Sequence, residues 1–193
     1  ILSDARDRGV RIDCDVYPYT AASNPLRNLM PAWLQEGGIE STLGRLANAD
    51  DRARLREEVD AEGLNNFGRI PSWDAVRISI SPDLPQYAGR TIASIAEEKG
   101  TDGFDAALDY IRDDRGQTRV LVESISEDDV QDFVRSTEVM VGSDGNSVSP
   151  EGTTGQGRPH PRFYGTFAKV LGHYSRDLGL LPLQGAVYKM TGA

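Results

Sequence analysis

The sequence predicts an α/β fold with a parallel component. Short segments with the pattern of a strand alternate along the chain with segments of helical spacing, as in βαβ units. Three of the four strand segments end at a Pro or a Gly. Four strands are too few to close an eight-stranded barrel, so we do not expect a complete barrel in this chain.

The first predicted strand covers residues 10–17, where apolar residues alternate with Arg and Asp until Pro18 ends the strand. From residue 17 to residue 23 we expect the end of this strand followed by a loop. Three further strands are predicted over residues 73–81, 119–124 and 139–141. In each, apolar residues either alternate with polar ones or form a short run.

Helical spacing of apolar residues occupies most of the remaining chain, and several of these segments follow a residue that can cap a helix. Asp50 is the expected cap of a helix over 51–61, and Asp102 of a helix that follows it. Ser126, with Asp129 three residues later, has the pattern of a capping box. Further helices are expected over residues 39–47, 167–178 and 183–190, and at the start of the chain before Gly9. Another opens at residues 89–91, with Ile92, Ile95 and Ala96 on one face.

Composition excludes several classes of function. The chain has 193 residues, 38% of them hydrophobic, which is enough for one domain with a core. A net charge of -9 without a basic patch argues against a nucleic-acid partner. No apolar run reaches membrane-spanning length, and Cys14 has no second Cys for a disulfide, so we expect a cytoplasmic protein. Since both ends have the pattern of a helix, we expect a piece of a longer protein.

The most informative stretch of the sequence runs from Glu138 to Gly145. It consists of a short apolar run followed by residues that favour a turn. Asp144 follows the predicted strand at its carboxyl end, which is where α/β proteins place their chemistry. Asp and Gly are also ordinary turn residues, so a purely structural turn is the alternative. The segment 145–157 has the composition of an active-site loop and equally of a surface loop.

Five segments, taken in order, resemble one protein family. They are Asp15–Ala21, Met30–Trp33, Val141–Gly145, His160–Gly172 and Ala186–Gly192. Together they resemble the N-acyl-D-amino-acid deacylases (D-aminoacylases) of the amidohydrolase superfamily. The resemblance implies a zinc-dependent hydrolase on a distorted (β/α)8 barrel. It implies that this chain is a partial (β/α)8 barrel, one incomplete catalytic domain over 1–193, with barrel-derived parts at 1–19 and 118–193 and a mostly helical insertion at 20–117.

The resemblance also implies roles for four residues. Asp144 would take a proton from a metal-activated water, pass it to the leaving nitrogen, and be able to reach a second metal position. Arg162 would bind the α-carboxylate of the substrate, and Tyr17 and Ser23 would lie near the substrate. Packing for Tyr17 and loop hydrogen bonding for Ser23 are the alternatives. The family's main zinc ligands have no counterpart here, since His160 and His173 have no partner at ligand spacing.

We therefore expect the longer protein to hydrolyse N-acyl-D-amino acids, small-molecule substrates, and this chain alone to be inactive. Two alternatives stay open: a non-catalytic assembly module on the same scaffold, and another amidohydrolase of the dihydroorotase or hydantoinase kind. The insertion is either a lid over the substrate or a surface elaboration, and the preferred acyl group and amino acid stay open. We also expect open strand edges to let the fragment self-associate.

Overall fold

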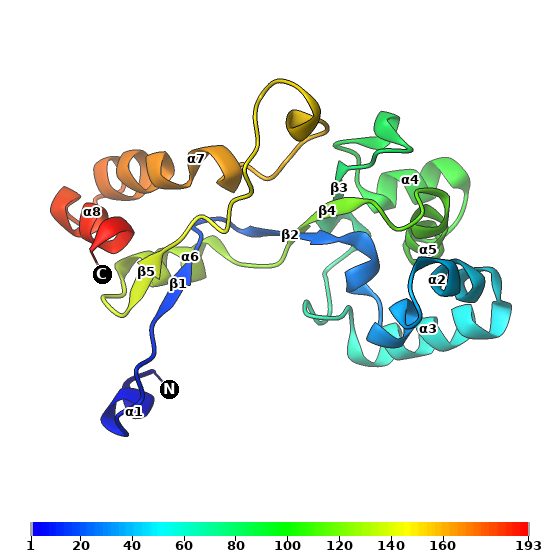
Figure 1. Ribbon diagram of the computed structural model, residues 1–193, viewed down its shortest axis with the longest axis horizontal. Helices are drawn as coiled ribbons and strands as arrows, with labels where there is room; N and C mark the ends of the chain where they lie inside the picture. Colours follow the sequence, from blue (N-terminus) through cyan, green and yellow to red (C-terminus); the bar gives the residue numbers. More distant parts are fainter. Residues whose placement is uncertain (1, 193) are drawn as a thin grey trace. The chain divides into compact units, whose positions relative to one another are not determined.

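The computed structural model describes residues 2–192, and these form two compact units (Figure 1). The first unit contains residues 2–20, 125–149 and 161–192. The second unit contains residues 21–124 and 150–160. Helices and strands mix in both, which confirms the α/β class. No helix among the described residues is long and apolar enough to cross a membrane.

The first unit is built on a parallel pair of short strands, β1 (Cys14–Val16) and β5 (Val139–Val141). Cys14 lies opposite Val139, and Val16 opposite Val141. This pair is the predicted parallel component. The strand predicted over 10–17 is shorter than expected because β5 offers a partner to three of its residues, and a strand needs a partner to form its ladder.

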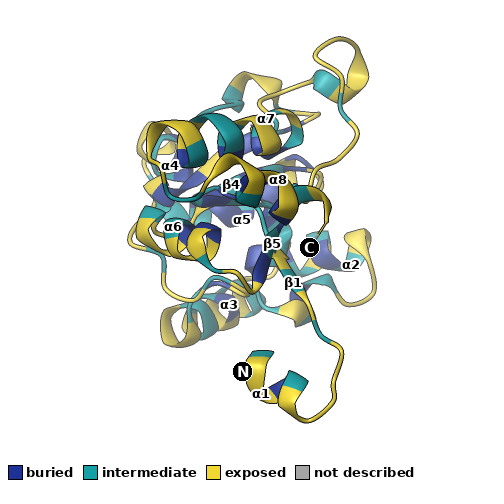
Figure 2. Cartoon of the chain, turned by 90° about the vertical axis from the view of Figure 1, so that its left-hand side faces the viewer, coloured by how far each residue is buried: buried dark blue, intermediate teal, exposed yellow. Residues whose placement is uncertain are grey.

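Helices complete the first unit. They are α1 (Leu2–Asp7), α6 (Glu127–Arg135), α7 (Arg162–Lys169), the π-helix η6 (Val170–Asp177) that continues α7, and α8 (Leu183–Thr191). The predicted cap of α6 is confirmed, since Ser126 Oγ accepts from the Asp129 amide at 3.0 Å. A small core joins these elements: Val130, Val134, Val141, Val170, Tyr174 and Ala186. In α1 the buried side chain is Ala5 (Figure 2).

The second unit holds an antiparallel sheet in the order β2 (Ala21–Pro25), β4 (Arg119–Glu123) and β3 (Val76–Ile80). The prediction of a loop through residue 23 was wrong, because residues 21–25 form β2. Ala-Ala-Ser-Asn-Pro has no apolar alternation to indicate a strand. Its pairing with β4 supplies the hydrogen bonds that make it one.

Helices α2 (Ile39–Ala47), α3 (Ala49–Glu62), α4 (Ile92–Lys99) and α5 (Gly103–Asp113) pack with the sheet around one apolar core. Short 3-10 turns lie between these helices and strands: Leu26–Leu29, Ala32–Gln35, Trp73–Ala75 and Pro85–Tyr87. A further 3-10 turn, Thr153–Gly155, lies in the segment 150–160. Asp102 caps α5 as predicted. Asp50 does not cap α3, because Asn48 Oδ1 accepts from the amides of Asp50 and Asp51.

The two units differ from the predicted division at 20 and 118. Residues 118–124 were assigned to the barrel-derived part, yet β4 is the central strand of the second unit's sheet. Residues 150–160 also pack with the second unit, where the Arg158 amide donates to the Ser79 carbonyl at 2.7 Å. These hydrogen bonds join segments far apart in sequence, which composition alone does not indicate.

Candidate functional site

Asp144 lies just beyond the carboxyl end of β5, as predicted. The Gly142 amide donates to the Val16 carbonyl at 3.2 Å and so extends the strand pair by one residue. A Cβ at Gly142 would lie 1.9 Å from Asp15 Oδ2, so glycine fits a close approach to β1 there. Asp144 itself has φ of 43°, a left-handed conformation that Asp tolerates better than most residues.

Arg162 begins α7 and points at Asp144. Its Nη2 lies 2.8 Å from Asp144 Oδ2, and its Nε donates to the Asp144 carbonyl oxygen at 3.0 Å. The Arg162 side chain is 6% exposed, whereas that of Asp144 is 69% exposed. The buried guanidinium therefore holds both the side chain and the backbone of an acid whose carboxylate still reaches solvent.

Tyr17 completes this cluster. The Arg162 guanidinium carbon lies 4.5 Å from the centre of the Tyr17 ring, within cation–π range. Burial raises the pKa of the Tyr17 phenol, Arg162 lowers it by charge and hydrogen bonding, and Asp144 raises it. The pKa of Tyr17 is raised overall, although a phenol of ordinary pKa is already neutral near pH 7. The structure thus brings three of the four predicted site residues together in the first unit.

Ser23, the fourth predicted residue, belongs to the second unit. It pairs with Leu121 across β2 and β4, and Arg119 Nη2 approaches its Oγ at 3.5 Å. His160 also belongs to this unit, where it is buried and its Nε2 lies 2.8 Å from the Ala21 carbonyl oxygen. His160 therefore contacts the backbone at the start of β2.

The prediction missed Lys169, which lies two helical turns after Arg162. Its Nζ donates to the Pro18 carbonyl at 2.8 Å and sits 4.5 Å from the centre of the Tyr19 ring. Burial lowers the pKa of Lys169, and the charge of Glu127 partly opposes this. Arg162 contacts Tyr17, and Lys169 contacts Pro18. These two contacts bind the loop that follows β1 to helix α7. The helix was predicted to begin at residue 167, so the seven-residue spacing of Arg162 and Lys169 on one helix became visible only with α7.

The described residues hold no group of three or more His, Cys, Asp or Glu that could bind a metal ion. Asp144 can offer one carboxylate to an ion held by other ligands. The donors within residues 2–192 therefore do not make a zinc site by themselves. What the cluster can do chemically is accept and return a proton at the Asp144 carboxylate and bind an anion at the Arg162 guanidinium.

Comparison with known proteins finds relatives that are similar to this chain in sequence and solved structures that are similar to it in fold. No family model matches it. A D-aminoacylase of Alcaligenes xylosoxydans xylosoxydans is 39% identical over 109 residues, 56% of this chain and 20% of that protein. A crystal structure of D-aminoacylase, described as a novel subset of amidohydrolases, matches 99% of this chain with a TM-score of 0.62 and 30% identity. The chain is thus similar to a segment of these D-aminoacylases.

Other relatives agree with this D-aminoacylase resemblance, which confirms the family predicted from the five segments. An N-acyl-D-glutamate deacylase of Alcaligenes xylosoxydans xylosoxydans is 34% identical over 123 residues, 64% of this chain and 23% of that protein. The N-acyl-D-glutamate deacylase of Bordetella bronchiseptica, solved with zinc and a phosphonate inhibitor, has a TM-score of 0.63 and 27% identity over 98% of this chain and 29% of its own. The chain thus spans between 20% and 30% of these relatives.

Proposed function

We propose that the protein containing this chain is a zinc-dependent amidohydrolase that converts an N-acyl-D-amino acid into a carboxylate and a free D-amino acid. This chain would supply the last strands of its (β/α)8 barrel and an insertion. The proposal rests on the ion pair and the hydrogen bond between Arg162 and Asp144, which lies beyond the carboxyl end of a parallel strand pair. Barrel enzymes place their catalytic groups at that end of the strands.

Asp144 would move the proton of the reaction. A zinc ion held by ligands of the longer protein would supply a bound water whose pKa is lowered to roughly 7. The Asp144 carboxylate accepts a proton as the water oxygen bonds to the amide carbon. It returns that proton to the nitrogen as the carbon–nitrogen bond breaks, so that the amine leaves neutral. The 69% exposure of the Asp144 side chain leaves this carboxylate accessible to such a water.

Arg162 would bind the α-carboxylate of the substrate. A guanidinium suits this task because it can bond two carboxylate oxygens at once. An incoming carboxylate competes with Asp144 Oδ2 for the guanidinium, while the bond from Nε to the Asp144 carbonyl can persist. Substrate binding would therefore release the Asp144 carboxylate for proton transfer without moving its backbone.

The test is deacylation of N-acetyl-D-methionine by the full-length protein with added zinc, with the L-enantiomer assayed in parallel. Asp144→Asn should lower kcat by roughly 100-fold or more, because it removes a general acid–base group. Asp13→Asn is the matched control, since Asp13 is an exposed carboxylate of the same unit that pairs with Arg6. This chain alone should be inactive.

Full activity in Asp144→Asn would remove Asp144 from the mechanism. A full-length protein that is inactive on N-acyl-D-amino acids of several acyl groups and side chains would overturn the proposed reaction. It would favour the assembly-module or dihydroorotase-like alternative, which activity on a cyclic amide would separate.

A further inference from the structure

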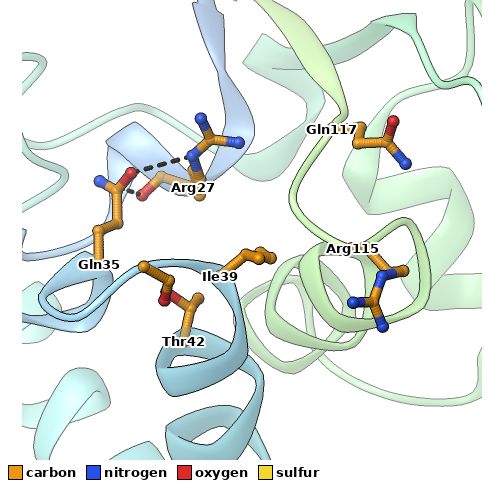
Figure 3. Close-up of a pocket in the computed structure, with 7 residues that line it drawn as sticks. Arg27, Gln35, Ile39, Thr42, Arg115 and Gln117 are labelled. Atoms are coloured by element: carbon orange, nitrogen blue, oxygen red, sulfur yellow. Dashed lines mark hydrogen bonds between the residues drawn. The ribbon is translucent and has the colours of Figure 1, made fainter.

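A polar cavity of about 550 Å³ lies within the second unit, and none of its lining residues belongs to the Asp144 cluster. Three segments enclose it: the turns that follow β2, the start of α2, and the turn between α5 and β4 (Figure 3). Its lining residues are mostly basic or amide-bearing. They are Arg27, Gln35, Gly38, Ile39, Thr42, Arg115 and Gln117.

Arg27 is a half-buried guanidinium whose bonded partners are uncharged. Its Nε donates to Gln35 Oε1 at 3.0 Å, and its Nη1 donates to the Gly116 carbonyl oxygen. Within residues 2–192, Arg27 makes no ion pair with a carboxylate. Neutral acceptors fix the orientation of a guanidinium without cancelling its charge, so Arg27 presents a preorganised cation to the cavity.

Arg115 is the second cation of the lining, and it pairs with Glu40 in the first turn of α2. Both side chains are more than half exposed, at 54% for Arg115 and 76% for Glu40. An exposed pair of this kind is weak and exchanges readily for another anion. The Glu40 carboxylate therefore binds the Arg115 guanidinium in the way that a carboxylate or phosphate group of a ligand would.

The start of α2 adds partial positive charge to the same wall. Gly38 and Ile39 line the cavity, and Gly38, with φ of 84°, begins the helix without a side chain that caps it. The first amides of a helix point outward and attract anions. The helix N-terminus therefore adds to an anion site whose main groups are the Arg27 and Arg115 guanidinium groups.

We propose that this cavity binds a small oxyanion, with Arg27 as the fixed donor and Arg115 exchanging Glu40 for the ligand. The ligand would carry a carboxylate or a phosphate group. Both present two or more oxygens, and one guanidinium can donate hydrogen bonds to two of them at once. Glu40 is then a built-in competitor. Arg27 has no carboxylate partner among the described residues, and the Glu40 partner of Arg115 is exposed, so both guanidinium groups can accept an anionic ligand.

The experiment is calorimetric titration of the protein with inorganic phosphate and with succinate, at constant ionic strength set by chloride. One or both probes should bind, and the tighter one identifies a phosphate or a carboxylate ligand. Arg27→Gln and Arg115→Gln should each raise Kd at least tenfold, and Glu40→Gln should lower it. Arg69→Gln, an exposed arginine of the same unit bonded to the Ala61 carbonyl, should leave Kd unchanged.

Because the Arg115 side chain is exposed, Arg115→Gln should keep the fold even if Arg27→Gln does not. The site does not exist if neither probe binds above the chloride background, or if Arg115→Gln and Arg69→Gln give the same Kd. The readout is binding and not deacylation, so this result stands apart from the proposed enzymatic activity.

Discussion

Arg162 binds Asp144 at two points, with Nη2 2.8 Å from the carboxylate oxygen Oδ2 and Nε donating to the backbone carbonyl at 3.0 Å. One buried side chain thus fixes both the left-handed backbone and the carboxylate of Asp144, which lies beyond the carboxyl end of β5. Because Arg162 also lies over the Tyr17 ring, it connects the loops that follow β1 and β5. The cluster is therefore organised around the arginine.

Arg162→Lys should lower kcat/KM for N-acyl-D-amino acids at least tenfold in the full-length protein. A lysine ammonium keeps the charge but has no planar fork, so it cannot hold the Asp144 carbonyl while it binds two oxygens of a substrate carboxylate. Steady-state kinetics with zinc measure the effect. Arg135→Lys, an exposed arginine of α6 paired with Asp132, should behave as the unaltered protein. Equal kcat/KM values for the two variants would show that the fork is dispensable.

Lys169→Met should lower kcat/KM about tenfold, because the Pro18 carbonyl loses a charged donor and the Tyr17 loop loosens. Lys169→Arg should restore part of the activity, since it retains a donor. Lys99→Met removes an exposed lysine that pairs with Asp113 at 3.7 Å, and it serves as the control. If Lys169→Met changed thermal stability alone, Lys169 would have no positioning role.

The stability of the second unit should fall above pH 10 because of Tyr110. This phenol is fully buried and donates to Ser81 Oγ at 3.0 Å, and burial raises its pKa to about 12. The raised pKa means that the unfolded chain releases the proton first, so stability present below pH 10 is lost as pH rises toward 12. The loss should be on the order of 2 kcal/mol.

Urea unfolding at several pH values between 9 and 12 measures this loss. Tyr110→Phe should remove that part of the pH dependence. Tyr188→Phe alters a tyrosine that is 61% exposed and should leave the slope unchanged. A Tyr110→Phe variant with the same alkaline slope as Tyr188→Phe would show that Tyr110 is not the group responsible.

Two glycines of the second unit should respond oppositely to alanine. A Cβ at Gly103 would lie 2.2 Å from Trp73 Cδ1, so Gly103→Ala should destabilise by about 1–3 kcal/mol through overpacking. Gly44 lies inside α2 with no atom within 4 Å of such a Cβ, so Gly44→Ala should stabilise by about 0.5–1 kcal/mol. The free energy of unfolding in urea measures both. Effects of the same sign would contradict the packing described around Trp73.

Local signals predicted some elements well. Asp102 and Ser126 cap the helices that they precede, because a cap depends on amides two or three residues away. The apolar run at 139–141 became β5, with Asp144 beyond it. Residues 21–25 show the opposite case. Their polar composition hides a strand whose partner, β4, lies about a hundred residues further along the chain.

The sequence by itself determined the α/β class, the family resemblance, and the choice of Asp144, Arg162 and Tyr17 as candidate site residues. Residue types and short spacings carry that information, because they follow from local backbone and side-chain chemistry. The tertiary structure alone decided that Arg162 grips Asp144 and that Lys169 holds Pro18. It alone also placed Arg27 and Arg115 around one cavity. Contacts between distant segments depend on how strands pair and helices pack, and no local pattern specifies those distances.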